Sequence, residues 1–221
     1  RIFYREEYNY RRVLKQISHS LAGIVEIESL LSYLAIRIAE VLHSANIVIY
    51  LLDEKRDQYV PRYSLSADRM MLRGFARSGT LTRLLAPQGQ TLNVERTVAS
   101  NRPLPVSYDE ARALAAVDSS LVVPFVFKSR LLGFMSIGKK RGGGFYATTD
   151  VELLEILCDQ ASVAIENARL YVETVEKEKM EKELEIASEI QRRLLPKVLP
   201  NIPGLKVHGL NVPSKHVGGD Y

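Results

Sequence analysis

A chain of 221 residues with 46% hydrophobic residues is long and apolar enough to bury one good-sized core or two small ones. The formal net charge of +4 comes from 30 basic and 26 acidic residues mixed along the chain, which argues against a dedicated nucleic-acid surface. A single cysteine, Cys158, excludes an internal disulfide. Its place on the apolar side of a helical pattern predicts a small buried side chain in a reducing cytosol.

The sequence contains no candidate membrane span and no signal peptide, because Lys128 and Arg130 interrupt even its most apolar stretch, residues 121–137. It begins at Arg1 without a methionine and stops at Tyr221 before a further element is complete. We therefore expect a cytoplasmic piece of a longer protein.

The first 21 residues predict an amphipathic helix with a narrow apolar seam, the pattern of a helix that pairs with another. The seam consists of Phe3, Tyr10, Leu14, Ile17 and Leu21. This stretch resembles the juxtamembrane helix after the last membrane span of many bacterial sensor proteins, which implies a membrane tether upstream of residue 1. His19 lacks the acidic neighbour and the following proline of a phospho-accepting histidine, so we interpret it as a helix-surface residue.

Residues 27–65 predict a helix and two strands. An apolar stripe over residues 27–43 indicates a second amphipathic helix. Residues 45–52, ANIVIYLL, are apolar on both faces, as expected for a central strand covered on both sides. Residues 58–65 form the second strand, which Pro61 confines to an edge or a bulge.

Residues 66–116 are the least regular part: helical segments at 69–76 and 81–85, a strand at 91–94, a loop at 95–105 and a helical turn at 109–116. Long irregular segments often carry a binding surface. Arg62, Tyr63 and Arg102 are our candidates for a pocket that takes an anionic or aromatic ligand, with Arg73, Arg77 and Arg96 nearby. Solvated surface arginines are the alternative, and the favoured one for any single residue.

Two apolar runs at 119–127 and 131–137 predict a buried hairpin, in which Gly133 indicates close backbone approach to a neighbour. The following KKRGGG, residues 139–144, lacks the spacing and the Lys-Ser/Thr ending of a phosphate-binding loop. We interpret it as a flexible connection to a helix capped by Thr148 or Thr149.

Residues 150–195 contain no glycine or proline and predict one helix of about 70 Å. Its apolar stripe steps by four and three, except that the position after Val175 falls on Lys179 and the stripe resumes one residue late. The charged stretch between Glu173 and Glu185 gains only about 0.3 kcal/mol from each ion pair, so its helix needs a partner and we predict a parallel homodimer. The slip locally disturbs the coiled coil and makes a weak register point near Lys179. The stripe contains Ala161, Ile165, Ala168, Val172, Val175, Met180, Leu184, Ala187, Ile190 and Leu194.

The order of these elements, with Val123-Pro124-Phe125, Leu132-Gly133-Phe134 and the segment AIENARL at 164–170, resembles a GAF domain over residues 22–172. The resemblance implies an α+β fold with a central antiparallel sheet flanked by helices and a long C-terminal coiled-coil helix. It also implies a pocket that in other members holds cyclic nucleotides, chromophores, haem or small metabolites, or is empty. The chain lacks the NKFDE-type cyclic-nucleotide signature, Cys158 is not where a bilin attaches, and the ligand stays unknown.

Residues 184–221 resemble the start of a SpoIIE-like, PPM-type Ser/Thr protein phosphatase, through ASEIQ at 187–191, Leu194-Leu195-Pro196, Pro213 with Val217, and Gly218-Gly219-Asp220. In that family two Mn²⁺ or Mg²⁺ ions activate a water that attacks the phosphoryl group. Asp220 matches the first metal-binding aspartate. The family's other ligands have no counterpart up to Tyr221, so we expect this fragment to bind no metal and to be inactive.

These resemblances predict four segments: a coupling helix at 1–21, a GAF sensor domain at 22–172, a signalling helix at 173–195 and a truncated phosphatase start at 196–221. The leading hypothesis is a sensory region that regulates a bacterial phosphatase acting on a phosphorylated anti-sigma-factor antagonist. The alternative is a ligand-free GAF module for dimerisation and scaffolding. A sensor kinase or nucleotide cyclase is disfavoured, because no matching motif follows the GAF-like part.

Overall fold

The computed structural model describes residues 17, 20, 23–24, 26–86, 89–195 and 203–204. The chain divides into two compact units, one ending at Arg169 and the other beginning at Leu170, and each is described by itself. Apart from Ile17 and Ser20, the predicted helix at 1–21 lies outside the described residues, as does nearly all of the phosphatase-like segment at 196–221. Within the described ranges, no helix has both the length and the apolar character needed to cross a membrane.

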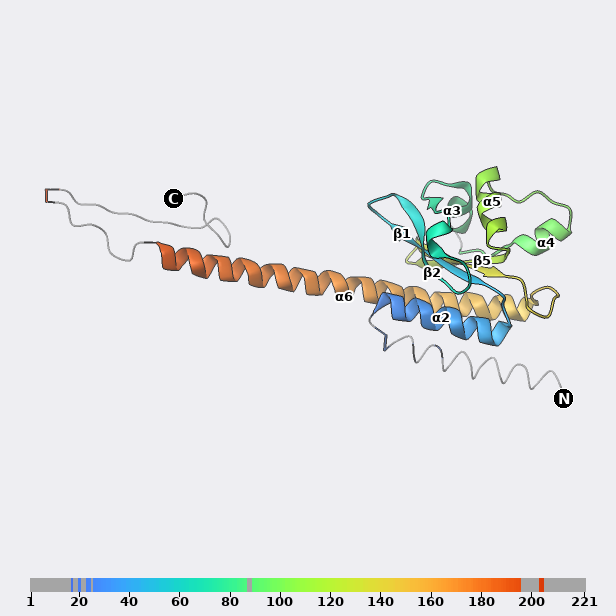
Figure 1. The fold of residues 1–221 in the computed structure, drawn as a ribbon, viewed down its shortest axis with the longest axis horizontal. Helices are drawn as coiled ribbons and strands as arrows, with labels where there is room; N and C mark the ends of the chain where they lie inside the picture. Colours follow the sequence, from blue (N-terminus) through green and yellow to red (C-terminus); the bar gives the residue numbers. More distant parts are fainter. Residues whose placement is uncertain are drawn as a thin grey trace. The chain divides into compact units, whose positions relative to one another are not determined.

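One antiparallel sheet organises the first unit, with strand order β3-β2-β1-β6-β5-β4 (Figure 1). β5 and β6 form the expected hairpin, and β1 lies between β2 and β6 as the predicted central strand. The strands are β1 (Ile47–Asp53), β2 (Gln58–Ser64), β3 (Phe75–Ala76), β4 (Leu92–Asn93), β5 (Ser119–Phe127) and β6 (Arg130–Gly138). The α+β fold predicted from the sequence is confirmed.

Two helices cover one face of this sheet. α2 (Ile27–Leu42) and the first part of α6 (Thr148–Leu194) run alongside each other and bury their apolar stripes against it (Figure 1). α2 ends where His43 adopts a left-handed conformation and donates its N–H to the carbonyl of Ala39. Cys158 is buried in this core, as predicted, and burial raises the pKa of its thiol.

Short helices cover the other face: α3 (Thr80–Leu85), α4 (Val94–Ala99) and α5 (Tyr108–Ala116). Four aromatic side chains fill the space between these helices and the sheet. The ring of Phe134 stacks on Tyr50 with 4.9 Å between centroids, and Phe75 meets both rings edge-on at 5.1 and 5.2 Å. Tyr59 completes the group, so the middle of this face is packed with side chains.

The irregular middle of the chain differs from the prediction in two places. The helical segment expected at 69–76 is only a 3₁₀ turn, η1 (Arg69–Met71), because Phe75 and Ala76 pair with Tyr59 and Gln58 as β3. The loop expected at 95–105 begins as helix α4. Its cap is the side chain of Asn93, which accepts a hydrogen bond from the N–H of Arg96.

Two positions singled out by their backbone demands are placed as expected. Pro61 lies opposite Tyr50, where the register of β1 and β2 shifts, so it occupies a bulge and not an outer strand. Gly133 lies in β6 between Leu51 and Phe125, and a Cβ atom there would come within 2.1 Å of the Tyr50 carbonyl oxygen. The expected close backbone approach is confirmed.

The start of α6 is capped by a residue other than the threonines we expected. The helix already includes Thr148, and the carboxylate of Asp150 accepts a hydrogen bond from the Ala147 N–H at 2.9 Å. The same carboxylate, itself buried, forms an ion pair with the half-buried Lys140 at 2.6 Å. An acidic residue in the first turn satisfies a free N–H and lies favourably in the helix dipole, so Asp150 takes the capping role.

Candidate ligand cavity and its link to the long helix

A cavity of about 460 Å³ lies between α4, α5 and the first residues of β5. This volume is within the range of small-molecule sites. Most of its wall is apolar, formed by Val94 and Val98 of α4, Leu104, Leu114 of α5, and Phe145. Its charged lining residues are Glu95, Asp118 and Lys139. All of these residues belong to the first unit.

Two buried oxygen atoms of the lining have no hydrogen-bond partner among the described residues: Oε2 of Glu95 and Oγ of Ser120. Ser120, with 1% of its surface exposed, lies where the register of β5 and β6 shifts between Ser119 and Leu121. A buried polar atom without a partner costs free energy, most of all on a carboxylate. The cavity therefore has two unsatisfied polar atoms in a lining that is mostly apolar.

Glu110 fixes the position of α5, which forms one wall of the cavity. Its Oε1 accepts a hydrogen bond from the N–H of Leu81 in α3 at 3.1 Å, and its Oε2 accepts one from the N–H of Ser107 at 2.8 Å. The side-chain oxygen of Ser107 in turn accepts a hydrogen bond from the Glu110 N–H, which completes a capping box. Glu110 was not among the residues predicted from the sequence, although the spacing of Ser107 and Glu110 is that of a capping box.

α4 and Thr91, the residue before β4, are each tied to the start of α6 by a hydrogen bond. Nη2 of Arg96 in α4 donates a hydrogen bond to the carbonyl of Tyr146, at 3.2 Å, just before α6 begins. Thr91 donates from Oγ1 to Oε1 of Glu155 in α6, at 2.7 Å. Tyr146 is itself buried, and its hydroxyl donates a hydrogen bond to the Gly138 carbonyl. Burial is the main cause that raises the pKa of this hydroxyl to about 12. A displacement of α4 would therefore act on the first turns of α6.

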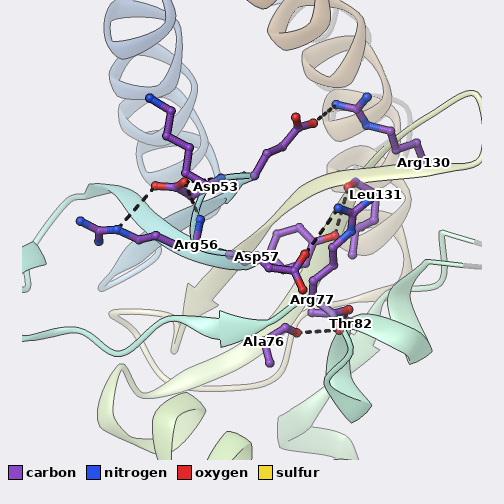
Figure 2. Close-up of polar contacts among 11 residues, drawn as sticks. Asp53, Arg56, Asp57, Ala76, Arg77, Thr82, Arg130 and Leu131 are labelled. Carbon is purple, nitrogen blue, oxygen red and sulfur yellow. Dashed lines mark hydrogen bonds and ion pairs between the residues drawn. The ribbon is translucent and has the colours of Figure 1, made fainter.

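The arginines near the turn between β1 and β2 take part in surface ion pairs (Figure 2). Arg77 pairs with Asp57 at 3.5 Å and Arg130 with Glu54 at 3.6 Å, and all four side chains are exposed. Such pairs contribute about 1 kcal/mol or less each. For Arg77, the solvated alternative is therefore the one that the structure favours.

The structure does not bring the three pocket candidates together. Tyr63 packs against the core on the face covered by α2 and α6, whereas Arg102 lies in the loop after α4, on the other face. Arg62 is exposed on β2, and its carbonyl accepts a hydrogen bond from Arg69. None of the three lines the cavity. Glu95 and Ser120 were not among the residues predicted from the sequence. Each is distinguished by a buried side-chain oxygen atom that has no hydrogen-bond partner among the described residues.

The apolar stripe of α6 divides into two parts. Ala161 and Ile165 are buried in the core of their own domain, and Ala168 is also buried, so they are not available to a partner chain. The exposed apolar residues of this part are Ile156 and Val163, seven residues apart, with Leu170 seven further on. In the second unit the predicted seam is exposed at Val172, Val175, Lys179, Met180, Ile190 and Leu194, and Leu184 is half-buried.

No group of three or more potential metal ligands lies close together in the ranges that the structure describes. Asp220, the candidate metal ligand of the phosphatase-like segment, lies outside those ranges. The site defined by the described residues is thus the cavity and its connection to α6.

A family model for the GAF domain matches residues 26–167, more than half of the chain. The GAF domain of a phosphoenolpyruvate-protein phosphotransferase from Acinetobacter has 20% identity and a TM-score of 0.56, covering 72% of this chain and 93% of its own. Its counterpart from Coxiella burnetii has 18% identity and a TM-score of 0.59, covering 74% and 96%.

Free methionine-R-sulfoxide reductase from Neisseria meningitidis, solved with its substrate, has 20% identity and a TM-score of 0.56, covering 73% of this chain and 91% of its own. At these identities the solved structures are evidence of a shared fold alone. No curated protein sequence matches the chain. The family model and the sheet order agree with the resemblance found in the sequence, and the chain belongs to the GAF domain family.

Proposed function

We propose that this chain is the sensory region of a bacterial signalling protein, in which the GAF domain controls an output domain through α6. The observation that carries the proposal is the continuity of α6 from Thr148 to Leu194. Its first part is core of the GAF domain, and its remainder, from Leu170 on, belongs to the second unit. A change at the cavity wall has a route to α6 through Arg96 and Thr91.

The output that we propose is a metal-dependent Ser/Thr phosphatase of the SpoIIE-like type. Support comes from the sequence after α6, in which Gly218-Gly219-Asp220 matches the start of the metal site. The complete enzyme would hold Mn²⁺ or Mg²⁺ with carboxylates, and its proposed substrate is a phosphorylated anti-sigma-factor antagonist.

A chain extended beyond Tyr221 through the next domain is expected to release phosphate from a phosphoserine peptide when Mn²⁺ is present. Asp220→Asn in that chain should remove the activity, because a neutral amide is a poor replacement for a metal-bound carboxylate. The 221-residue chain, assayed in parallel, should be inactive. An extended chain that carries a kinase or cyclase activity instead would contradict the phosphatase proposal while leaving the sensory role intact.

We also propose a homodimer through the second part of α6. Val172 and Val175 are exposed apolar residues on a helix otherwise rich in charge, and isolated helices of this kind depend on a partner. Val172→Glu with Val175→Glu is expected to convert a dimer to a monomer, measured by light scattering at tens of micromolar. Thr174→Glu, which adds the same type of charge on another face of the helix, should leave the dimer unchanged. A wild-type chain that is already a monomer would contradict the proposal.

The packed space between the sheet and helices α3, α4 and α5 favours a second candidate function. In this alternative, the GAF module binds no ligand and serves for dimerisation. Phe134 and its aromatic neighbours occupy the space there. A thermal-shift screen of nucleotides and metabolites distinguishes the two candidates, since a ligand that binds only the folded chain raises its melting temperature. Self-association without any such shift would favour the ligand-free module.

A further inference from the structure

We propose that the cavity between α4 and α5 binds a small molecule with an apolar body and a protonated amine, and that the amine contacts Glu95. The inference rests on the proposed sensory function only for the consequence of binding, since binding itself does not require an output domain. The observations that carry it are the unpaired oxygen atoms of Glu95 and Ser120 and the apolar wall beside them.

The carboxylate of Glu95 determines the charge of the ligand. Oε2 is buried, yet no lysine or arginine among the described residues forms an ion pair with Glu95. The neighbouring Arg96 directs its guanidinium to the Tyr146 carbonyl instead. A buried carboxylate oxygen is stabilised by a cation that also donates hydrogen bonds, and a protonated amine supplies both.

The remaining lining supports the same assignment. Two acidic residues, Glu95 and Asp118, line the cavity against one basic residue, Lys139, so an anionic ligand would meet a net negative charge. Ser120 adds a second unpartnered oxygen to the lining, a hydroxyl that can accept an N–H.

The apolar body of the ligand would cover side chains that are otherwise left partly in water. Val98 and Phe145 both line the cavity and are 58% and 53% exposed. Leu104 and Leu114 continue the apolar wall inward. Removing such apolar surface from water stabilises the complex by about 25 cal/mol per Å² before the costs of binding.

Binding at this place would bear directly on the start of α6. Glu95 precedes Arg96, whose side chain holds the Tyr146 carbonyl, and the cavity residue Phe145 precedes Tyr146. Tyr146 in turn lies four residues before Asp150, the acidic residue of the first turn of α6. The proposed ligand thus lies between α4 and the segment that leads into the signalling helix.

Three probes of similar size test the charge assignment on the 221-residue chain by titration calorimetry at pH 7: 2-phenylethylamine, 2-phenylethanol and phenylacetate. We expect the amine to bind most tightly. Glu95→Gln should weaken the amine about tenfold or more, because it removes a charge-assisted hydrogen bond, and should leave the alcohol nearly unaffected. Glu152→Gln, which removes the same charge from an exposed position outside the cavity, is the matched control and should leave amine binding nearly unchanged.

Tightest binding of phenylacetate, an unchanged amine affinity in Glu95→Gln, or no binding of any probe at millimolar concentration would each overturn the proposal. Thermal unfolding of both variants shows whether they are folded, and Glu95→Asp, which keeps the charge, provides a second variant in which amine binding should be partly retained. The dimer-disrupting substitutions at Val172 and Val175 should leave amine binding unchanged. A failed output assay with intact amine binding would therefore count against the proposed function and not against the cavity.

Discussion

Gly133→Ala is expected to lower the free energy of unfolding by about 3 kcal/mol or more, or to prevent folding altogether. A Cβ atom at this position would lie 2.1 Å from the carbonyl oxygen of Tyr50, 2.7 Å from Cδ2 of Leu51 and 3.1 Å from its Cα. β6 has little freedom to move away, because it is paired with β1 on one side and β5 on the other. Urea denaturation followed by circular dichroism measures the loss.

Gly142→Ala is the control for Gly133. No atom lies within 4 Å of the Cβ that this substitution would add, and Gly142 does not have a positive φ. Its effect should stay within about 0.5 kcal/mol. If Gly133→Ala were as stable as the wild type, the register of β1 and β6 would differ from the one described.

Phe134→Ala is expected to destabilise the domain by about 3–5 kcal/mol. Phe134 is fully buried and contacts the rings of Tyr50, Tyr59 and Phe75, so its removal leaves a cavity and three aromatic edges without a partner. The change is measured as the shift of the urea midpoint at constant slope.

Phe145→Ala removes the same side chain from a half-exposed position. It should cost about 1 kcal/mol or less, because much of that ring is already in water. Equal losses at Phe134 and Phe145 would contradict the description of the aromatic group as the centre of this core. Phe134→Leu, which retains more volume, should fall between Phe134→Ala and the wild type.

The sequence predicted well those elements in which the periodic pattern of buried residues is long. The stripe of α2, the two apolar runs of the β5–β6 hairpin and the uninterrupted α6 each extend over enough residues to distinguish helix from strand. Gly133 was also predictable, because an isolated glycine in a buried strand points to backbone contact.

The elements that the sequence did not predict are short or depend on distant partners. α4 has six residues and one buried side chain, too few for a period, and only Asn93 before it marked its start. In α6 the period was correct, but the first residues of the predicted seam pack within their own domain: an apolar stripe that contains Ala161 and Ile165 is the same whether it faces a sheet or a second chain. Burial against the sheet was visible only in the structure.

The candidate site was the part least accessible from the sequence. Arg62 and Arg102 were candidates because the charge of an arginine can be recognised from the sequence alone. Glu95 and Ser120 became candidates because their oxygen atoms are buried without partners, a property that depends on the arrangement of α4, β5 and β6. The sequence contains 26 acidic residues, and nothing in it distinguishes Glu95 from the others.

The two helices beside the cavity differ in how firmly they are held. α5 is fastened to α3 by both carboxylate oxygens of Glu110. α4 buries only Val94 and packs along β5, and Arg96 in its middle donates a hydrogen bond to the Tyr146 carbonyl. Local opening costs least where few apolar contacts are lost, so of these two helices α4 is the one expected to open more easily. Opening of that one six-residue helix would widen the cavity while the sheet and its aromatic core stay folded.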